Sequence, residues 1–386
     1  MKVIAMIDSF KGSATSEELN QAALKGFPVQ WEKESILIAD GGEGTMAALF
    51  AAYGGQYKSV TSVGPLGEER VVSYLLTTIN QKRIAIIECA AIIGIQLLDP
   101  SDQTTRQASS YGLGLLIADA INEKVAQIYV TLGGSATTDG GLGLLEALGA
   151  ELMYQPAADA RNPLLTINYF SITAVQKLLS GIELLVLADV TNPYTGAEGF
   201  ATTFGPQKGA LPQTVQVLEQ QAKKVAYFVQ QEYQIDLNGI AGTGAAGGIG
   251  GAMVLLGGQI CPGFMTIAKL LKLETRISDA TLIITGEGRF DRQTAAGKVP
   301  LGVAKIAQPH AIPVVALCGQ REPDLGEIGQ YFAGIFSIQP GPLLLDEAMK
   351  KSVTLANMAE TAQAIAMFHE KITRANHGDG GGNGSF

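Results

Sequence analysis

The sequence predicts an α/β protein with a doubly wound parallel sheet and a second domain. Short apolar runs alternate with segments of helical periodicity at residues 2–26, 35–53 and 126–148, which favours parallel strands connected by helices. That pattern breaks at residues 57–90, where three strand-like runs joined by short turns indicate an antiparallel meander. The length of 386 residues also exceeds what one hydrophobic core usually covers.

Three strand-loop-helix units in the first half of the chain carry most of this prediction. Each has an apolar run, a loop containing Asp or Gly, and a helical segment. In the first unit, Glu17 and Glu18 favour a helix start at Ser16, because acidic side chains stabilise the positive end of a helix. The predicted strands, loops and helices are 2–7, 8–13 and 16–26; 35–39, 40–44 and 45–53; and 126–132, 133–141 and 142–148.

The second half of the chain continues the alternation of predicted strands, polar loops and helices. A strand at residues 183–188 ends at Asp189, and an amphipathic helix is expected at 212–232. The apolar run that begins at Leu282 stops at Gly286, so residues 286–297 are expected to form a loop that carries Glu287 and Arg289. Further segments are expected as a glycine run at 239–258, a helix at 262–277, and strands at 313–317 and 334–338.

Composition and charge exclude several classes of function. A net charge of −9 without a basic stretch disfavours nucleic acid and anionic membranes as partners. The sequence has no run of eighteen apolar residues, and its first residues resemble a strand rather than a signal peptide, so we expect a cytoplasmic protein. Three cysteines without C-x-x-C spacing argue against a disulfide framework or a zinc site. The sequence allows a homodimer without fixing the oligomeric state.

Five polar loops at predicted strand ends suggest the chemistry. All five contain Asp, one of them together with Glu287, and three are rich in glycine. Carboxylates with hydroxyl groups suit Mg²⁺, and glycine loops at helix starts suit phosphate. Lys11, Lys208 and Lys298 could neutralise a phosphoryl group in transfer. The pattern favours phosphoryl transfer from a nucleotide. The loops are 8–13, 39–45, 133–141, 188–193 and 286–291.

Other interpretations of the same residues stay open at this point. An Asp after a strand often only caps the next helix. The stretch from Gly242 to Gly247 fits G-x-G-x-x-G, which raises a nicotinamide-dependent oxidoreductase acting on a small hydroxy acid, although no convincing strand precedes it. A non-catalytic sensor of nucleotides or sugar acids is a third class, which the many strand-end carboxylates disfavour.

Six ordered motifs resemble the bacterial glycerate kinase family, type 1, whose members are glycerate 2-kinases. They read DSFKGS, IADGGEGT, LGGSATTDGGLG, ADVTNPYTGAEGFATTFGPQKGA, AGTGAAGGIGG and ITGEGRFDRQTAAGK, and the resemblance runs from Lys2 to about Ile372. It implies transfer of the γ-phosphate of ATP to D-glycerate with Mg²⁺, giving 2-phospho-D-glycerate and ADP. It also implies two α/β domains with the active site in the cleft between them. One is a flavodoxin-like doubly wound parallel sheet, and the other has a mixed sheet resembling the restriction-endonuclease fold.

The domain boundaries follow from this resemblance and from the position of the meander. Residues 1–58 and 280–372 are expected to form the flavodoxin-like domain, which is therefore discontinuous in sequence. Residues 59–279 are expected to form the second domain. The glycine-rich tail, residues 373–386, cannot bury a core and is expected to be disordered.

The resemblance also implies roles for individual residues. Asp189, with Asp8 as second candidate, is expected to deprotonate the attacking hydroxyl, and Glu287 or Asp291 to hold the metal. Lys11 and Arg289 are expected to act in catalysis. The expected contacts of the substrate are Ser9, Lys11, Ser135 and Arg289, and those of the nucleotide are Gly133, Gly134, Ser135, Lys208, Gly286, Gly288 and Lys298.

Overall fold

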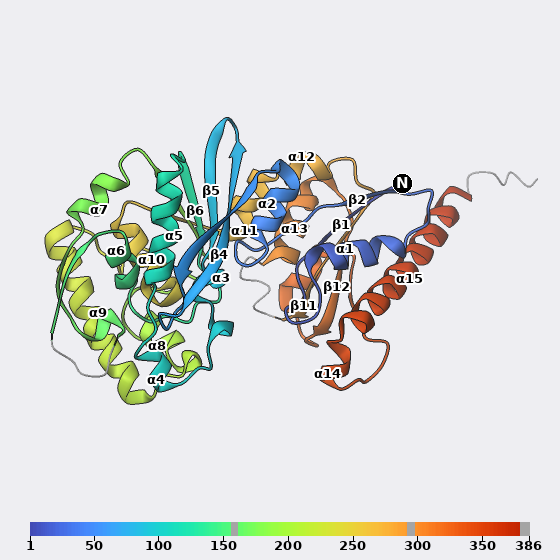
Figure 1. Ribbon diagram of the computed structural model, residues 1–386. Helices are drawn as coiled ribbons and strands as arrows, with labels where there is room; N and C mark the ends of the chain where they lie inside the picture. Colours follow the sequence, from blue (N-terminus) through green and yellow to red (C-terminus); the bar gives the residue numbers. More distant parts are fainter. Residues whose placement is uncertain (156–160, 292–297, 379–386) are drawn as a thin grey trace, which may run out of the picture. The chain divides into compact units, whose positions relative to one another are not determined.

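The computed structural model describes residues 1–155, 161–291 and 298–378 (Figure 1). The chain divides into two compact units, one of which is built from both ends of the sequence. Unit 1 comprises Met1–Asp40 and Leu271–Phe386, and unit 2 comprises Gly41–Leu270. The boundaries expected from the sequence, after residue 58 and before residue 280, lie further along the chain than these junctions. Among the described helices, none combines the length and the apolar character that crossing a membrane requires.

Unit 1 contains a parallel sheet of five strands. In chain order within this unit the strands are arranged 2-1-3-4-5, which is the flavodoxin-like order. Every neighbouring pair is parallel, so the predicted doubly wound parallel sheet is confirmed. From one edge to the other the strands are β13 (Gly334–Ser337), β12 (Val314–Arg321), β11 (Leu282–Phe290), β1 (Lys2–Ile7) and β2 (Glu32–Ser35).

Helices cover both faces of this sheet (Figure 1). On one face Ala5 of β1 packs in a core with Leu19 of α1 and Met358 of α15. On the other face Cys318 of β12 packs with Leu301 of α13. The period of two along each strand thus supplies apolar side chains to both faces, as a sheet between helices requires. The helices are α1 (Ser16–Lys25), α12 (Leu273–Ile277), α13 (Val299–Ala307), α14 (Leu345–Ala348) and α15 (Lys351–Gly378).

Strand β11 is longer than the sequence predicts. The expected loop begins at Gly286, but the strand continues to Phe290 in parallel register with β12. Two features explain this difference. A Cβ on Gly286 would lie 1.9 Å from the carbonyl oxygen of Leu317, so glycine permits close strand contact here rather than a turn. Phe290 is also fully buried in the core beside α13.

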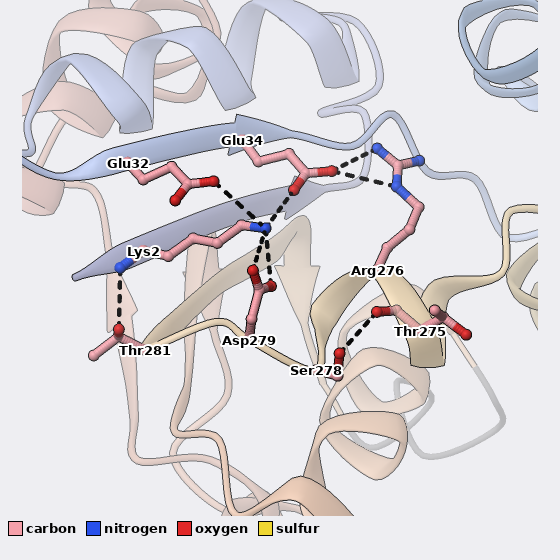
Figure 2. Close-up of polar contacts among 8 residues, drawn as sticks. All are labelled: Lys2, Glu32, Glu34, Thr275, Arg276, Ser278, Asp279 and Thr281. Carbon is pink, nitrogen blue, oxygen red and sulfur yellow. Dashed lines mark hydrogen bonds and ion pairs between the residues drawn. The ribbon is translucent and has the colours of Figure 1, made fainter.

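Strand β2 lies earlier than predicted and is formed by charged residues. Residues 36–39, expected as strand, follow it as buried irregular chain. The parallel register places the Lys2 ammonium 3.8 Å from a Glu32 carboxylate oxygen, 3.0 Å from Glu34 and 2.9 Å from Asp279 (Figure 2). Arg276 pairs with Glu34 from the other side at 2.7 Å (Figure 2). Ion pairing therefore compensates for the weak apolar character of this edge strand.

The C-terminal helix departs from the expected disorder of the tail. α15 extends to Gly378, so residues 373–378 are helical. The remaining part of the predicted tail, residues 379–386, lies outside the described residues. The predicted helix start at Ser16 is confirmed. Thr15 caps α1 and forms a reciprocal capping box with Glu18.

Unit 2 is built on a mixed sheet of six strands. The predicted meander is confirmed, because β3, β4 and β5 pair antiparallel in sequence. It joins the strand-loop-helix part through the parallel pair β5 and β6, so one sheet contains both patterns. The strands from edge to edge are β10 (Gln259–Cys261), β9 (Glu183–Leu187), β6 (Gln127–Thr131), β5 (Lys82–Glu88), β4 (Glu69–Ile79) and β3 (Gln56–Val63), and a separate hairpin contains β7 (Glu151–Tyr154) and β8 (Ile167–Ser171).

Several helices of unit 2 pack around one large core. Leu116 of α5, Leu144 of α6 and Met253 of α10 are all buried in it beside Ile128 and Val130 of β6. The helices are α2 (Thr45–Tyr53), α3 (Cys89–Ile93), α4 (Asp102–Thr105), α5 (Tyr111–Asn122), α6 (Leu142–Ala147), α7 (Thr173–Leu178), α8 (Phe200–Phe204), α9 (Pro212–Tyr233), α10 (Ala245–Leu255) and α11 (Gly263–Leu270).

Candidate active site

A cavity of about 780 Å³ opens at the carboxyl ends of the strands of unit 1. β1 and β11 are neighbours there, and the chain leaves β1 toward β2 but enters β12 after β11. This is the topological switch point, where open α/β sheets bind ligands. The predicted site residues that line the cavity are Asp8, Ser9, Lys11, Glu287, Gly288, Arg289 and Lys298.

Helix α1 holds the end of β1, and with it Asp8, in place. The backbone N–H of Ile7 donates to Asn20 Oδ1 at 2.9 Å, and the Ser16 hydroxyl donates to the Ile7 carbonyl. The N–H of Asp8 then donates to the carbonyl of Gly286 at 2.9 Å, across to β11. Asn20 is completely buried, so its amide serves the backbone rather than a ligand. The Asp8 side chain therefore starts from a well-defined backbone position.

The electrostatic environment of Asp8 is unfavourable for a carboxylate. Burial, followed by the negative charges of Asp40 and Glu287, raises the pKa of Asp8 to about 7. A hydrogen bond from the Ser9 N–H at 2.8 Å and the charge of Lys11 act in the opposite direction. A carboxyl group with this pKa exchanges protons readily near neutral pH, as a general base must.

Cationic side chains surround these carboxylates. Lys298 Nζ lies 3.5 Å from Glu287 Oε2. Arg289 pairs with Asp291 at 3.4 Å and with Glu322 at 3.0 Å, and its side chain is 62% exposed. Lys11 is exposed at the rim of the cavity. The cavity thus brings together groups that accept a proton and groups that neutralise phosphate.

The predicted metal ligands lie in different surroundings. Glu287 is buried, and its charge acts on Asp8 together with that of Asp40. A carboxylate oxygen is a ligand that suits a hard cation such as Mg²⁺. Asp291 pairs with Arg289. Within residues 1–155, 161–291 and 298–373, no three His, Cys, Asp or Glu side chains are grouped so that they could hold a metal ion. Mg²⁺ needs only one or two protein carboxylates, because water and phosphate oxygens complete its shell.

Unit 2 contains a second group of predicted site residues. Lys208 is 5% exposed, and its ammonium group donates to Ser135 Oγ at 3.1 Å and to the Thr137 carbonyl at 2.7 Å. Burial lowers the pKa of Lys208 to about 8. Gly133 and Gly134 are exposed beside Ser135. Lys208 was expected to contact the nucleotide, and the structure has it inside the protein, where it supports the loop that carries Ser135.

Asp189 differs from Asp8 in its surroundings. It follows β9 and is exposed. Its Oδ1 accepts a hydrogen bond from the Gly263 N–H at 2.8 Å, at the start of α11. The carboxylate thus serves at least in part to cap that helix. Thr294, which belongs to the sixth motif, lies outside the described residues.

The G-x-G-x-x-G stretch is a packing element of unit 2. Residues 234–244 form no strand, so the stretch does not follow one as a dinucleotide-binding fingerprint would. The N–H of Gly140 donates to the Gly247 carbonyl at 2.9 Å. A Cβ on Gly247 would lie 1.9 Å from the Thr137 carbonyl oxygen. Glycine is required here for close backbone contact, and the oxidoreductase interpretation is not favoured.

Sequence reasoning missed two features. The first is Glu88, 8% exposed, whose carboxylate accepts a hydrogen bond from the Met46 N–H at 2.8 Å and so occupies the start of α2. Burial raises the pKa of Glu88 to about 7. A lone acid at the end of the apolar run 84–87 could have signalled it. The second is segment 337–349, which lines the cavity of unit 1 and contains the apolar run Pro342–Leu345.

Comparison with known proteins agrees with the six motifs. Residues 3–370 match the model of the glycerate kinase family. The glycerate 2-kinase of Escherichia coli is 36% identical, covering 91% of this chain and 93% of that protein. The glycerate kinase of Halalkalibacterium halodurans is 34% identical, covering 96% and 99%. A crystal structure from Salmonella typhimurium, described as a glycerate kinase 2, is 35% identical with a TM-score of 0.83, covering 97% and 99% of the two chains.

Proposed function

Because this chain belongs to the glycerate kinase family, we propose that it transfers the γ-phosphate of ATP to the 2-hydroxyl of D-glycerate, giving 2-phospho-D-glycerate and ADP. The observation that carries the proposal is the half-buried Asp8 carboxyl, with its pKa raised to about 7, in a cavity that Lys11, Arg289 and Lys298 also line. The similarity to a glycerate 2-kinase supports the position of transfer.

Asp8 is the proposed base. Its raised pKa matches the task of accepting the hydroxyl proton near neutral pH. Asp189 ranks second as a base for two reasons. Its side chain is exposed, and its carboxylate already accepts a hydrogen bond from the Gly263 N–H. Phosphoryl transfer passes through a loose transition state in most analyses, so Asp8 contributes chiefly by orienting the hydroxyl.

The positive side chains have a separate task. Lys298 and Lys11 neutralise the phosphates, and Arg289 with Ser9 and Lys11 binds the carboxylate and hydroxyls of glycerate. Gly288 lines the cavity, where a missing Cβ leaves room for phosphate. In unit 2, Ser135 is a proposed substrate contact whose hydroxyl is held by Lys208. Gly133 and Gly134 beside it are proposed phosphate contacts.

Mg²⁺ is the proposed metal. Glu287 would hold it with Asp40 nearby, and Asp291 is the alternative ligand. When bound, the ion supplies neutralisation of charge on the phosphate oxygens. The negative charges of Asp40 and Glu287 raise the cost of a charge on Asp8, and a cation would relieve that cost. The predicted cytoplasmic location suits an ATP-dependent reaction, and the homodimer stays a prediction.

The test is a coupled assay of ADP release with ATP, Mg²⁺ and D-glycerate, followed by phosphorus NMR of the product. A 2-phosphate is coupled to one carbon-bound proton and gives a doublet, whereas a 3-phosphate is coupled to two and gives a triplet. Glycerate-dependent ADP release with a doublet is the expected result. A triplet would overturn the position of transfer, and no ADP release above the level without glycerate would overturn the kinase.

A further inference from the structure

The lining of the cavity of unit 1 has two chemically different parts, called here the charged end and the apolar end. The charged end consists of strand-end residues such as Asp8, Glu287 and Lys298. The other end is formed by segment 337–349, which contributes Pro342, Leu343, Leu345 and Met349 among others. The proposed reaction accounts for the charged end only. Glycerate has three carbons and no apolar face, so it has no use for the second end.

The apolar side chains at this second end are poorly covered by protein. Leu343 is 47% exposed, Leu345 is 70% exposed and Met349 is 37% exposed. Large apolar side chains that gather at a cavity without being covered by protein commonly mark a binding surface. Leu344, between the two leucines, is 82% exposed but does not line the cavity. The segment therefore directs alternate leucines toward the cavity.

Segment 337–349 is tied to the loop that carries Lys11. The Thr354 hydroxyl donates to the Ala348 carbonyl at 3.1 Å and is also hydrogen-bonded to the Ser13 hydroxyl at 2.7 Å. Met349 Cε lies 3.0 Å from the position that a Cβ on Gly12 would take. One anchored surface thus joins the apolar end to the cationic loop. A ligand with an apolar part and a polyanionic part would match both.

We propose that the apolar end binds the nucleoside of the phosphate donor, with the base lying on Leu343, Leu345 and Met349. This assignment rests on the proposed kinase function. The faces of a purine are apolar and flat, so they gain by leaving water for aliphatic side chains. Ser337 and Gln339 line the same end and offer hydrogen-bonding groups to the polar edge of the base. The triphosphate then extends toward Lys11 and Lys298.

The size of the cavity supports this assignment. A volume of about 780 Å³ lies within the range of roughly 300–1,000 Å³ that is usual for cofactor and drug-sized ligands. The charged end alone would be enough for glycerate. A nucleoside triphosphate would occupy both the charged end and the apolar end. Its base would account for the apolar side chains that segment 337–349 contributes to the cavity.

The test compares three leucines of one segment. Leu343→Asp and Leu345→Asp place a charge where the base would lie, whereas Leu344→Asp adds the same charge outside the cavity as the matched control. We expect KM for ATP to rise about tenfold or more in the first two variants. A tenfold loss of affinity corresponds to the free energy gained by burying part of one leucine side chain. KM for glycerate should stay within about twofold, and Leu344→Asp should behave as wild type. Circular dichroism checks that all three variants fold.

A competitor without a base separates the two ends of the cavity. Inorganic tripolyphosphate carries the charge of ATP but no nucleoside. It should inhibit wild type and Leu345→Asp equally. Direct titration of ATP into the protein without glycerate should show weaker binding to Leu345→Asp, and Leu345→Met should restore it. Equal ATP binding by the wild type and the Leu343→Asp and Leu345→Asp variants would overturn the inference, and so would a rise in KM for glycerate alone.

The two proposals fail in different ways. If wild type binds ATP with this pattern but releases no ADP with glycerate, the kinase function is wrong and the nucleoside site stands. If ADP is released and the leucine variants leave ATP binding unchanged, the function stands and the nucleoside site is wrong.

Discussion

Asp8 in unit 1 and Asp139 in unit 2 occupy similar places in sequence but opposite environments. Each lies in a loop between a buried strand and a helix. Asp139 is fully buried, and its carboxylate accepts hydrogen bonds from the N–H and hydroxyl of Ser110 at 2.6 and 2.8 Å, and from the N–H groups of Gly141 and Gly143 at 3.0 and 3.2 Å. Asp8 accepts a hydrogen bond from Ser9 and faces two other carboxylates.

The comparison shows that the number of hydrogen-bond donors around a carboxylate determines whether it can still bind a proton, a cation or a substrate. Burial raises the pKa of both groups, and in Asp139 four hydrogen bonds oppose that shift. A carboxylate whose lone pairs are taken up by the backbone stabilises its loop but has little capacity left for a substrate. A carboxylate crowded by like charges gains from a proton or a cation. We therefore propose a role in the reaction for Asp8 and a structural role for Asp139.

The largest expected effect comes from Asp8→Asn. The amide cannot accept the hydroxyl proton, so we expect kcat to fall by about 10²–10⁴-fold. The fold should persist, because the change removes one of three crowded charges. ADP release under saturating ATP and glycerate measures the loss, with thermal melting as the control. Wild-type kcat in Asp8→Asn would transfer the role of base to Asp189, where Asp189→Asn should then show the loss.

Asp139→Ala should lower stability and leave activity largely unchanged, the opposite of Asp8→Asn. The substitution leaves the donors of Ser110, Gly141 and Gly143 buried without an acceptor, so we expect a loss of about 3 kcal/mol in the free energy of unfolding. Urea denaturation followed by circular dichroism measures it. The protein that remains folded should keep most of its kcat. Unchanged stability together with lost activity would place Asp139 in the chemistry and break the comparison.

Lys208→Met tests whether a buried cation can support a site without touching ligand. The methionine loses the hydrogen bonds to Ser135 and Thr137 while removing a buried charge, so the net effect on stability should be small. We expect kcat/KM to fall about tenfold, because the Ser135 hydroxyl is no longer oriented. In the double variant Lys208→Met with Ser135→Ala the two losses should not add. Strict additivity would show that Lys208 acts independently of Ser135.

The smallest expected effect is the pH dependence of stability. The folded-state pKa of Asp8, about 7, lies above the ordinary value of 3.8 for an aspartate, so the folded protein binds more protons between these values. Stability from this group therefore falls as pH rises from about 4 through 7. Activity should rise over the upper part of the same range. Asp8→Asn should weaken the fall in melting temperature between pH 5.5 and 8. Glu88, whose pKa is also raised to about 7, adds a fall in stability of the same sign.

Local sequence pattern alone determined most of the elements. Apolar periodicity predicted β1, α1, β6 and α9 close to their observed bounds, because that periodicity depends on near neighbours. The meander was evident for the same reason. The parallel and the mixed sheet were expected and are confirmed. The predicted site residues of unit 1 that line its cavity all belong to motifs that are visible in the sequence, whereas segment 337–349, which also lines it, belongs to none.

Tertiary structure determined which of the candidate site residues still have hydrogen-bonding groups available for a ligand. The donors that occupy Asp139 come partly from Ser110, and the carboxylates that crowd Asp8 come from Asp40 and Glu287. Lys208 is inside the protein because Ser135 and Thr137 accept its hydrogen bonds. β11 continues past Gly286 because β12 lies against it. Each outcome depends on partners distant in sequence, which a pattern of near neighbours cannot encode.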